Sequence, residues 1–178
     1  MRSSIAPEKF NADSFRIFDK GWFLLTGGDF YRKSFNAMTV SWGGFGTMWG
    51  KPVVTVVVRP QRHTLKFLDA GEDFTLCAFG EEFKEALTFL GRNSGRDVPD
   101  KIAKAGLTPM RSDEVAAPAY TEAELVIECR KLYRGELKGK DFCEKSLIRE
   151  CYPDGDFHYF FVAEVKAITG SDKYKKQF

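Results

Sequence analysis

Short runs of β-branched and aromatic residues, bounded by glycine or proline, recur through the first half of the chain and predict β-strands. They cover residues 22–26, 35–42, 53–59 and 74–79. Two longer segments of the second half alternate apolar with polar residues, as half-buried antiparallel strands do. In the first segment, one face is predicted to carry Leu125, Ile127, Cys129 and Tyr133. In the second segment, one face is predicted to carry Phe157, Tyr159, Phe161, Ala163, Val165 and Ala167.

Helical spacing of apolar residues predicts one helix over residues 83–91. Shorter helices are predicted at 64–70, before a glycine, and at 99–106, between a proline and a glycine. Strands outnumber helices and do not alternate with them regularly. The pattern therefore favours a mainly β fold, a small barrel with covering helices, over a doubly wound parallel sheet.

The length of 178 residues suits one ordinary domain, and no linker, repeat or low-complexity tract divides it. We expect a single domain over residues 1–178, with its core at about 22–168 and an extension at each end. The 17 phenylalanines indicate an aromatic-rich core or a cofactor pocket. A net charge of +2 is too small to imply a nucleic-acid partner, so the basic run at 173–176 is interpreted as a solvated tail.

No apolar stretch approaches the length of about 18 residues that a membrane span needs, and the N-terminus lacks the apolar core of a secretory signal. We therefore expect a cytoplasmic protein without membrane partners. Its four cysteines form no Cys-x-x-Cys pair, and only two histidines are present, so reduced thiols and no metal site are expected.

Arg59, Arg62 and Thr64 come directly before a predicted helix start, where free backbone amides and the helix dipole favour an anion. Two guanidinium groups can add charge-assisted hydrogen bonds, so the segment forms a candidate phosphate site. The alternative is that Thr64 only caps the helix and both arginines are solvated.

The strand predicted at 35–42 has one face of small or hydroxyl-bearing residues, against which a planar ligand could lie. That face carries Ala37, Thr39 and Ser41, and the other carries Met38, Val40 and Trp42. An ordinary amphipathic strand with its polar face in water explains the same alternation.

The glycine-rich segment Gly43 to Gly50 fits neither a Gly-x-Gly-x-x-Gly frame nor a Walker motif, and is interpreted as a hairpin turn beside the pocket. Asn93, Ser94 and Arg96 follow the predicted helix at 83–91 and offer amide, hydroxyl and guanidinium groups. The same loop can equally be a plain connection between helices.

His158 lies in the segment 157–168, on the face opposite Phe157 and Tyr159. Imidazole changes protonation near neutral pH, so His158 could orient a nicotinamide or donate a proton. A structural histidine is the alternative. No Gly-x-Ser-x-Gly elbow is present, and nucleophilic hydrolysis has no support.

Four segments, taken in order, resemble the flavin reductase-like, FMN-binding split-barrel family, including its flavoredoxin branch, over roughly Trp22 to Ile168. They are Asn36 to Trp42, Arg59 to Thr64, Asn93 to Asp97, and His158 before Phe161-Val162-Ala163-Glu164-Val165. The resemblance implies a six-stranded Greek-key split barrel that forms a homodimer. FMN would lie in a groove near the subunit interface, with one side of its ring exposed to a nicotinamide donor.

The resemblance also implies roles for individual residues. Thr39 and Ser41 would line the isoalloxazine and ribityl chain, within a binding segment that also includes Asn36, Met38, Val40 and Trp42. Arg59, Arg62 and Thr64 would hold the phosphate; Asn93, Ser94 and Arg96 would close the pocket; His158 would approach the nicotinamide. The chain departs from the family in the aromatic bulk of Trp42, Phe45 and Trp49, which predicts a narrower pocket or retained flavin.

An NAD(P)H-dependent flavin reductase is the function that this resemblance implies. Hydride would pass from NADH or NADPH to FMN, and electrons onward to a redox protein or a monooxygenase. The alternative is a flavoredoxin-type electron carrier that holds FMN without oxidising NAD(P)H itself.

Overall fold

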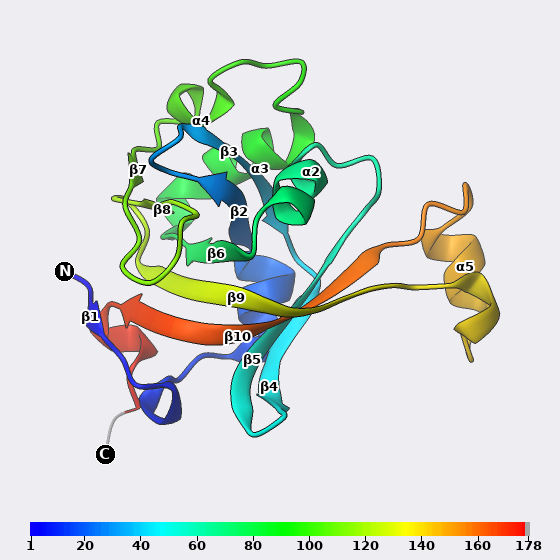
Figure 1. Ribbon diagram of the computed structural model, residues 1–178, viewed down its shortest axis with the longest axis horizontal. Helices are drawn as coiled ribbons and strands as arrows, with labels where there is room; N and C mark the ends of the chain where they lie inside the picture. The colour runs from blue at the N-terminus through cyan, green and yellow to red at the C-terminus, as the bar shows by residue number, and fades with distance from the viewer. Residues whose placement is uncertain (177–178) are drawn as a thin grey trace.

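An antiparallel β-sheet of eight strands dominates the computed structural model, which describes residues 1–176 (Figure 1). Its strands are β1 (Ser3–Ser4), β2 (Phe23–Asp29), β3 (Ser34–Val40), β4 (Gly43–Met48), β5 (Lys51–Val58), β6 (Asp73–Ala78), β9 (Leu125–Glu136) and β10 (Tyr159–Gly170). A separate pair is formed by β7 (Pro109–Met110) and β8 (Ala119–Tyr120). The count of eight corrects the expected six.

The strands follow the order β3-β2-β6-β9-β10-β5-β4, and β1 pairs with β10. The β9–β10 hairpin therefore lies between β5 and β6, which are consecutive in the chain; this insertion is the Greek-key feature of the fold. The sheet curls until β3 also contacts β5. Segments from opposite ends of the strand order thus meet at one place.

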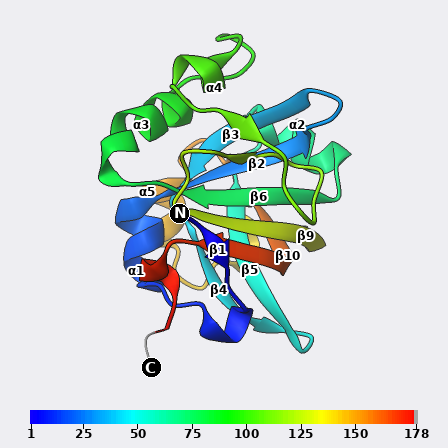
Figure 2. The same ribbon diagram turned by 90° about the vertical axis from the view of Figure 1, so that its left-hand side faces the viewer.

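Short helices surround the sheet: α1 (Ser14–Arg16), α2 (Thr64–Ala70), α3 (Lys84–Arg92), α4 (Lys101–Lys104) and α5 (Ser146–Cys151). A π-helix of five residues, Ile17–Gly21, continues α1. Turns of 3-10 helix lie at Pro7–Lys9, Glu81–Phe83, Gly139–Asp141 and Asp172–Tyr174. Figure 2 shows α3 and α4 at the β3 end of the sheet, with the β4–β5 hairpin at the opposite end. Within residues 1–176 no helix is long and apolar enough to cross a membrane.

The predicted helices at 64–70 and 83–91 are confirmed, the first at both ends. The third is shorter than predicted, because Asp100 adopts a left-handed conformation with φ of 54° and only Lys101–Lys104 is helical after it. Gly106, with φ of 73°, follows the helix as expected.

Both faces of the sheet's central strands are buried. Phe23 and Leu25 on β2 pack into the core inside the curled sheet, whereas Leu24 between them packs into a second core beneath α3. Because side chains alternate across a strand, a strand covered on both faces becomes a continuous apolar run. This burial explains why the first-half strands are so uniformly hydrophobic.

Two β-bulges interrupt the alternation predicted for β9 and β10. One follows Lys131, so Tyr133 faces away from the inner core and is 52% exposed. The other skips Lys166, so Ile168 replaces Ala167 in the inner core. The extra residue of a bulge moves every later side chain to the other face. The predicted positions of Tyr133 and Ala167 were therefore wrong.

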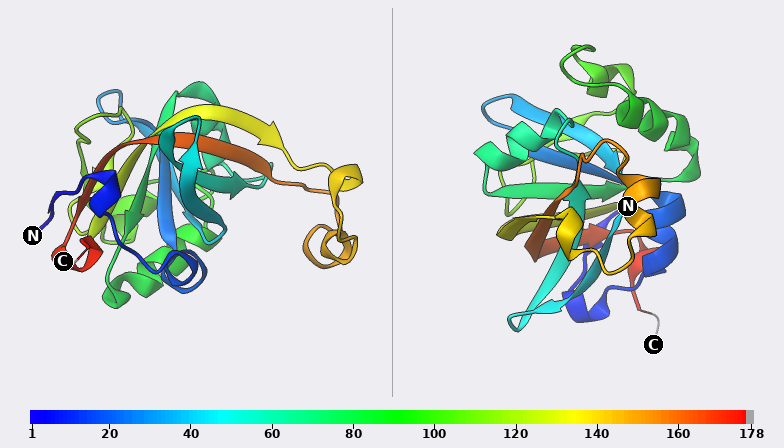
Figure 3. Two further views of the ribbon diagram at one scale, coloured as in Figure 1. Left: turned by 90° about the horizontal axis from the view of Figure 1, so that it is seen from below. Right: turned by 90° about the vertical axis from the view of Figure 1, so that its right-hand side faces the viewer.

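The β9–β10 hairpin extends beyond the rest of the sheet and carries α5 at its far end, as Figure 1 and the left view of Figure 3 show. An aromatic cluster of Phe142, Tyr152 and Phe157 packs within this extension, with ring centroids 4.9 to 5.7 Å apart. Residues 137–158 therefore form an arm with its own small apolar core.

The hairpin turn predicted over residues 43–50 was wrong in extent. Gly43–Met48 is strand β4, paired with β5, and only Trp49 and Gly50 turn the chain, with φ of 53° and 70°. Two adjacent residues with positive φ fit the tight turn that matches the twist of paired strands. Gly43 is required for another reason: a Cβ there would lie 2.3 Å from the Thr55 carbonyl oxygen.

We predict that Gly43→Ala destabilises the protein by about 1 to 3 kcal/mol, the usual cost of overpacking, because the added methyl would strike the β5 backbone and the Phe18 ring. Gly46→Ala on the same strand is the matched control, since a Cβ there has no neighbour within 4 Å. Urea denaturation of both variants measures the difference. Equal stabilities would contradict the close approach of β4 and β5.

Candidate functional site

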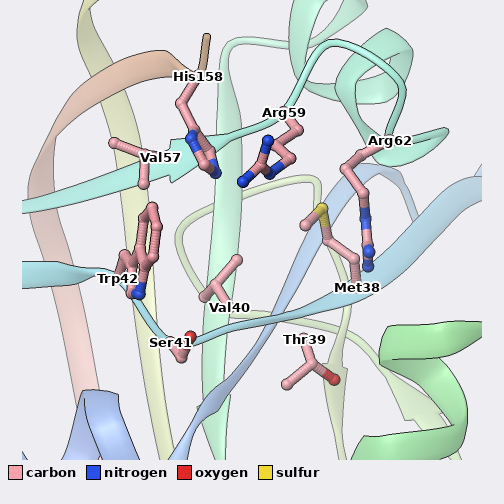
Figure 4. A pocket seen from close by; sticks show the side chains of 9 residues that line it. All are labelled: Met38, Thr39, Val40, Ser41, Trp42, Val57, Arg59, Arg62 and His158. Atoms are coloured by element: carbon pink, nitrogen blue, oxygen red, sulfur yellow. The ribbon is translucent and has the colours of Figure 1, made fainter. Parts of the chain in front are cut away.

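A cavity of about 250 Å³ opens where the end of β3 approaches the end of β5 (Figure 4). Its lining consists of Met38, Thr39, Val40, Ser41, Trp42, Val57, Arg59, Arg62 and His158. A narrower cavity of about 80 Å³ shares Met38 and Arg62 with it. The narrow cavity is completed by Asn36, Gln61, His63, Thr64, Gly91, Arg92, Asn93, Ser94, Gly95 and Lys101.

Strand register explains why these separate segments meet. Tyr159 of β10 pairs with Val58 of β5, so the residues next to them, His158 and Arg59, lie side by side at the same end of the sheet. The contact between β3 and β5 adds residues 38–42 opposite them. Every site residue predicted from the sequence lines one of the two cavities except Arg96.

Arg62 lies at the junction of the two cavities. Figure 4 shows its side chain beside Met38. Its guanidinium has no hydrogen bond or ion pair to a side chain within the described part of the chain, and burial lowers its pKa. A partly desolvated cation without a partner is a strong attractor for an anion.

Lys101 supplies a second cation and was missed by the sequence analysis. Its Nζ donates to the carbonyl oxygens of Leu90 and Asn93, at 3.1 and 2.9 Å. Burial, and then the neighbouring charge of Arg62, lower the pKa of Lys101 to about 8. A lysine in a short predicted helix is normally solvated, so no local signal distinguished this one.

Asn36 and Thr64 connect β3 to α2 beneath the narrow cavity. The Asn36 amide donates to the Thr64 hydroxyl at 2.8 Å, and both residues are buried. Because the hydroxyl accepts this bond, its own proton is available to a ligand. Asn36 therefore positions Thr64, and Thr64 faces the cavity.

Arg59 is engaged by the arm. Its guanidinium pairs with Asp156 and donates to the Cys151 carbonyl oxygen at 2.8 Å, and it also lies over the Tyr152 ring. Gln61 donates to the same Asp156 carboxylate at 2.8 Å. Arg59 thus borders the wide cavity with its charge already paired, unlike Arg62.

The loop after α3 is held mainly by its own polar groups. The Asn93 amide donates to the Phe89 carbonyl oxygen at 2.8 Å, and the Ser94 hydroxyl accepts from the Arg96 amide at 3.1 Å. Arg96 donates to the Gln61 carbonyl oxygen at 3.0 Å, outside both cavities. Arg96 thus connects the loop after α3 to the loop before α2.

The hydroxyl face of β3 lies against α3. The Thr39 hydroxyl donates to the Leu87 carbonyl oxygen at 2.5 Å, and a Cβ at Gly91 would lie 3.2 Å from the Thr39 side chain. The idea of a planar ligand on this face is therefore corrected: the opposite face, with Met38 and Val40, joins the cavity wall. Ser41, beyond the strand end, lines the cavity directly.

The three aromatic residues noted as a departure have different places. Trp42 lines the cavity, is 46% exposed, and lies 5.1 Å from the His158 ring centroid. Phe45 packs in the inner core against Phe18, and Trp49 is exposed at the β4–β5 turn. Of the three, only Trp42 lines this cavity, and the expected narrower pocket or retained flavin stays a prediction.

His158 is buried, and its Nδ1 lies 2.8 Å from the Tyr152 hydroxyl. Burial, and then the charge of Arg59, lower the pKa of His158 to about 4, so the expected change of protonation near neutral pH was wrong. The Tyr152 hydroxyl has no other partner in residues 1–176, and burial raises its pKa. Donation from this hydroxyl to Nδ1 would leave the imidazole proton on Nε2, and we expect this tautomer.

Comparison with known proteins supports one family. A family model described as "Flavin reductase like domain" matches residues 15–177. An uncharacterised protein of Aeropyrum pernix is 31% identical over 124 residues, which are 70% of this chain and 40% of that protein. The chain thus spans less than half of the length of this relative.

Solved structures share the fold. A flavoredoxin from Methanosarcina acetivorans matches with a TM-score of 0.66 and 21% identity, over 95% of this chain and 77% of that one. The Streptomyces globisporus C-1027 NADH:FAD oxidoreductase matches with a TM-score of 0.63 and 18% identity, over 87% and 78%. The predicted split-barrel fold is confirmed.

We predict that His158 adopts a mixture of its two neutral tautomers in Tyr152→Phe. In the parent protein the ¹⁵N chemical shifts of His158 should report a single Nε2–H form at pH 7, and in the variant a mixture, because Nδ1 loses its donor. His63, the other histidine, has no contact with Tyr152 and serves as an internal control in the same NMR spectrum. An unchanged His158 signal would show that Tyr152 does not set the proton position.

Proposed function

The chain belongs to the flavin reductase-like family, and from that premise we propose that it is an FMN-binding oxidoreductase that accepts hydride from NADH or NADPH. The observation that carries the proposal is the unpaired Arg62 guanidinium at the junction of a narrow and a wider cavity. This arrangement suits a ligand with a small anionic end and a broad planar end.

The residues of the narrow cavity fit a phosphate. Arg62 and Lys101 bring two positive charges, and the Thr64 hydroxyl offers a proton held in place by Asn36. Hydrogen bonds from charged donors to phosphate are short and strong, particularly where the donors are partly desolvated. Lys101 replaces Arg59 in the predicted phosphate-binding set.

The wide cavity fits a planar ring. Met38, Val40 and Val57 give it apolar walls, and Thr39 and Ser41 border it at the end of β3. When bound, FMN would supply the chemistry of accepting hydride and releasing electrons, while this chain supplies binding and orientation. Trp42 lies at the edge of this cavity and is partly exposed.

His158 acts in this proposal as a neutral hydrogen-bond donor. Its pKa of about 4 leaves no imidazolium to give up a proton at neutral pH. With Nδ1 held by Tyr152, its Nε2–H can orient a carbonyl or amide group of the donor or of the ring. Its contribution is positioning, with no transfer of its own proton.

A flavoredoxin-type electron carrier is the second candidate, and the contact between Trp42 and His158 favours it. These rings lie 5.1 Å apart at the edge of the wide cavity and restrict access for a nicotinamide. An electron carrier needs the same flavin site without a donor pocket. The homodimer, the redox-protein or monooxygenase acceptor, and the cytoplasmic location stay predictions.

We predict that Arg62→Met weakens FMN binding by about 1.5 to 3 kcal/mol, the range for a hydrogen bond to a charged group, which is about tenfold to a hundredfold in Kd. Methionine keeps the apolar stem and removes the charge. Arg149→Met on α5 makes the same charge change away from both cavities and should bind FMN normally. Quenching of flavin fluorescence measures both; equal affinities would remove Arg62 from the site.

The proposed function is tested by the flavin absorbance of the purified protein during anaerobic addition of NADH or NADPH. We expect a protein that binds FMN and loses its visible absorbance when the donor is added. A flavin band that survives both donors would favour the electron carrier. Protein that binds no added FMN would contradict both functions.

A further inference from the structure

A third cavity, of about 270 Å³, lies on the far side of the narrow cavity from the wide one. It shares Asn36, His63, Gly95 and Lys101 with the narrow cavity and none of its lining with the wide one. The rest of its lining is Lys33, Phe35, Phe67, Val98, Asp100, Ile102, Ala103 and Pro109. The proposed phosphate subsite therefore lies between two larger cavities.

The lining of the third cavity is suited to an aromatic base and a sugar. Phe35 and Phe67 provide aromatic surface, and Ile102 adds apolar wall, so a flat heterocycle can stack there. The Asp100 carboxylate has no hydrogen-bond or ion-pair partner within residues 1–176. A free carboxylate beside a base pocket is a suitable acceptor for ribose hydroxyls.

The boundary between the narrow and third cavities is positively charged. The Gly95 backbone packs closely against Asn36 and His63 at this boundary. A Cβ on Gly95 would lie 2.3 Å from the Asn36 side-chain oxygen and 3.3 Å from the His63 ring. The pKa of His63 is lowered by burial and by the nearby charges of Lys66, Arg96 and Lys101. Both cavities are partly open to solvent and share His63, Gly95 and Lys101, so a second phosphate could lie across the boundary beside these cations.

We propose that the third cavity binds the adenosine half of FAD, so that this chain holds FAD more tightly than FMN. The proposal rests on the proposed function, because it takes the narrow cavity as the flavin phosphate subsite. A dinucleotide flavin would place its ring in the wide cavity, its pyrophosphate at the boundary and its adenosine in the third cavity. FMN would leave the third cavity to solvent.

The test compares FAD and FMN on three proteins by flavin fluorescence titration. Ala103→Trp fills the third cavity from an exposed position on α4, and Lys104→Trp places the same side chain on the same helix outside the cavity lining. In the parent and in Lys104→Trp we expect FAD to bind about tenfold more tightly than FMN, the effect of about one base-stacking contact. In Ala103→Trp this preference should vanish, with FMN affinity unchanged.

A second variant tests the proposal independently if Ala103→Trp does not fold. Phe67→Ala removes aromatic surface from the third cavity without filling it, and should lower FAD affinity severalfold while FMN affinity stays the same. Parent protein that binds FMN at least as tightly as FAD would overturn the adenosine subsite and leave the proposed function standing. Protein that binds neither flavin would overturn both.

The nicotinamide donor also contains adenosine, and kinetics distinguish it from FAD. With FMN bound, Ala103→Trp should leave the KM for NADH and for NADPH unchanged. A raised KM with unchanged flavin affinities would assign the third cavity to the donor and overturn the proposal. Lys104→Trp is again the control.

Discussion

The pairing of β10 with β9 on one side and β5 on the other is the constraint on which the site depends. Tyr159 lies opposite Glu136 on β9 and opposite Val58 on β5. That register fixes His158 beside Arg59, and it directs the arm between β9 and β10 past the mouth of the wide cavity. A shift of one residue would exchange the two faces of β10, placing its inner-core side chains on the other side of the sheet.

The site separates groups that hold the scaffold from groups that are free to bind. Asn36 and Arg59 make hydrogen bonds that tie one segment to another, and the Asn93 side-chain amide caps the end of α3. Arg62 makes none to a side chain in the described residues, although it is partly buried. Burying an unpaired charge costs stability unless a partner arrives, so this guanidinium is the clearest structural indication of an anionic ligand.

Local signals predicted the elements well and the long-range contacts poorly. Apolar spacing located α3 and the following glycine located the end of α2, because both signals act within a few residues. The bulges near Tyr133 and at Lys166 could not be predicted, because they arise from how two strands are fitted together. The cavity-lining set followed from the family resemblance, but the burial of Lys101 depends on α3 and α4 meeting, which no local pattern encodes.

Arg59 illustrates why residue type alone does not determine a role. The sequence offers two arginines of equal chemistry three positions apart, both suited to a phosphate. The fold gives Arg59 an acceptor in Asp156, which lies 97 positions later in the chain, and a carbonyl oxygen at Cys151. Its charge then does two things: it fastens the arm to the end of β5, and it disfavours protonation of His158. The arm supplies the Tyr152 hydroxyl that hydrogen-bonds to His158 Nδ1 and so holds the imidazole ring in place. Burial and the Arg59 charge thus keep His158 neutral, and Arg62 is the arginine of this pair whose guanidinium stays without a side-chain partner in the described residues.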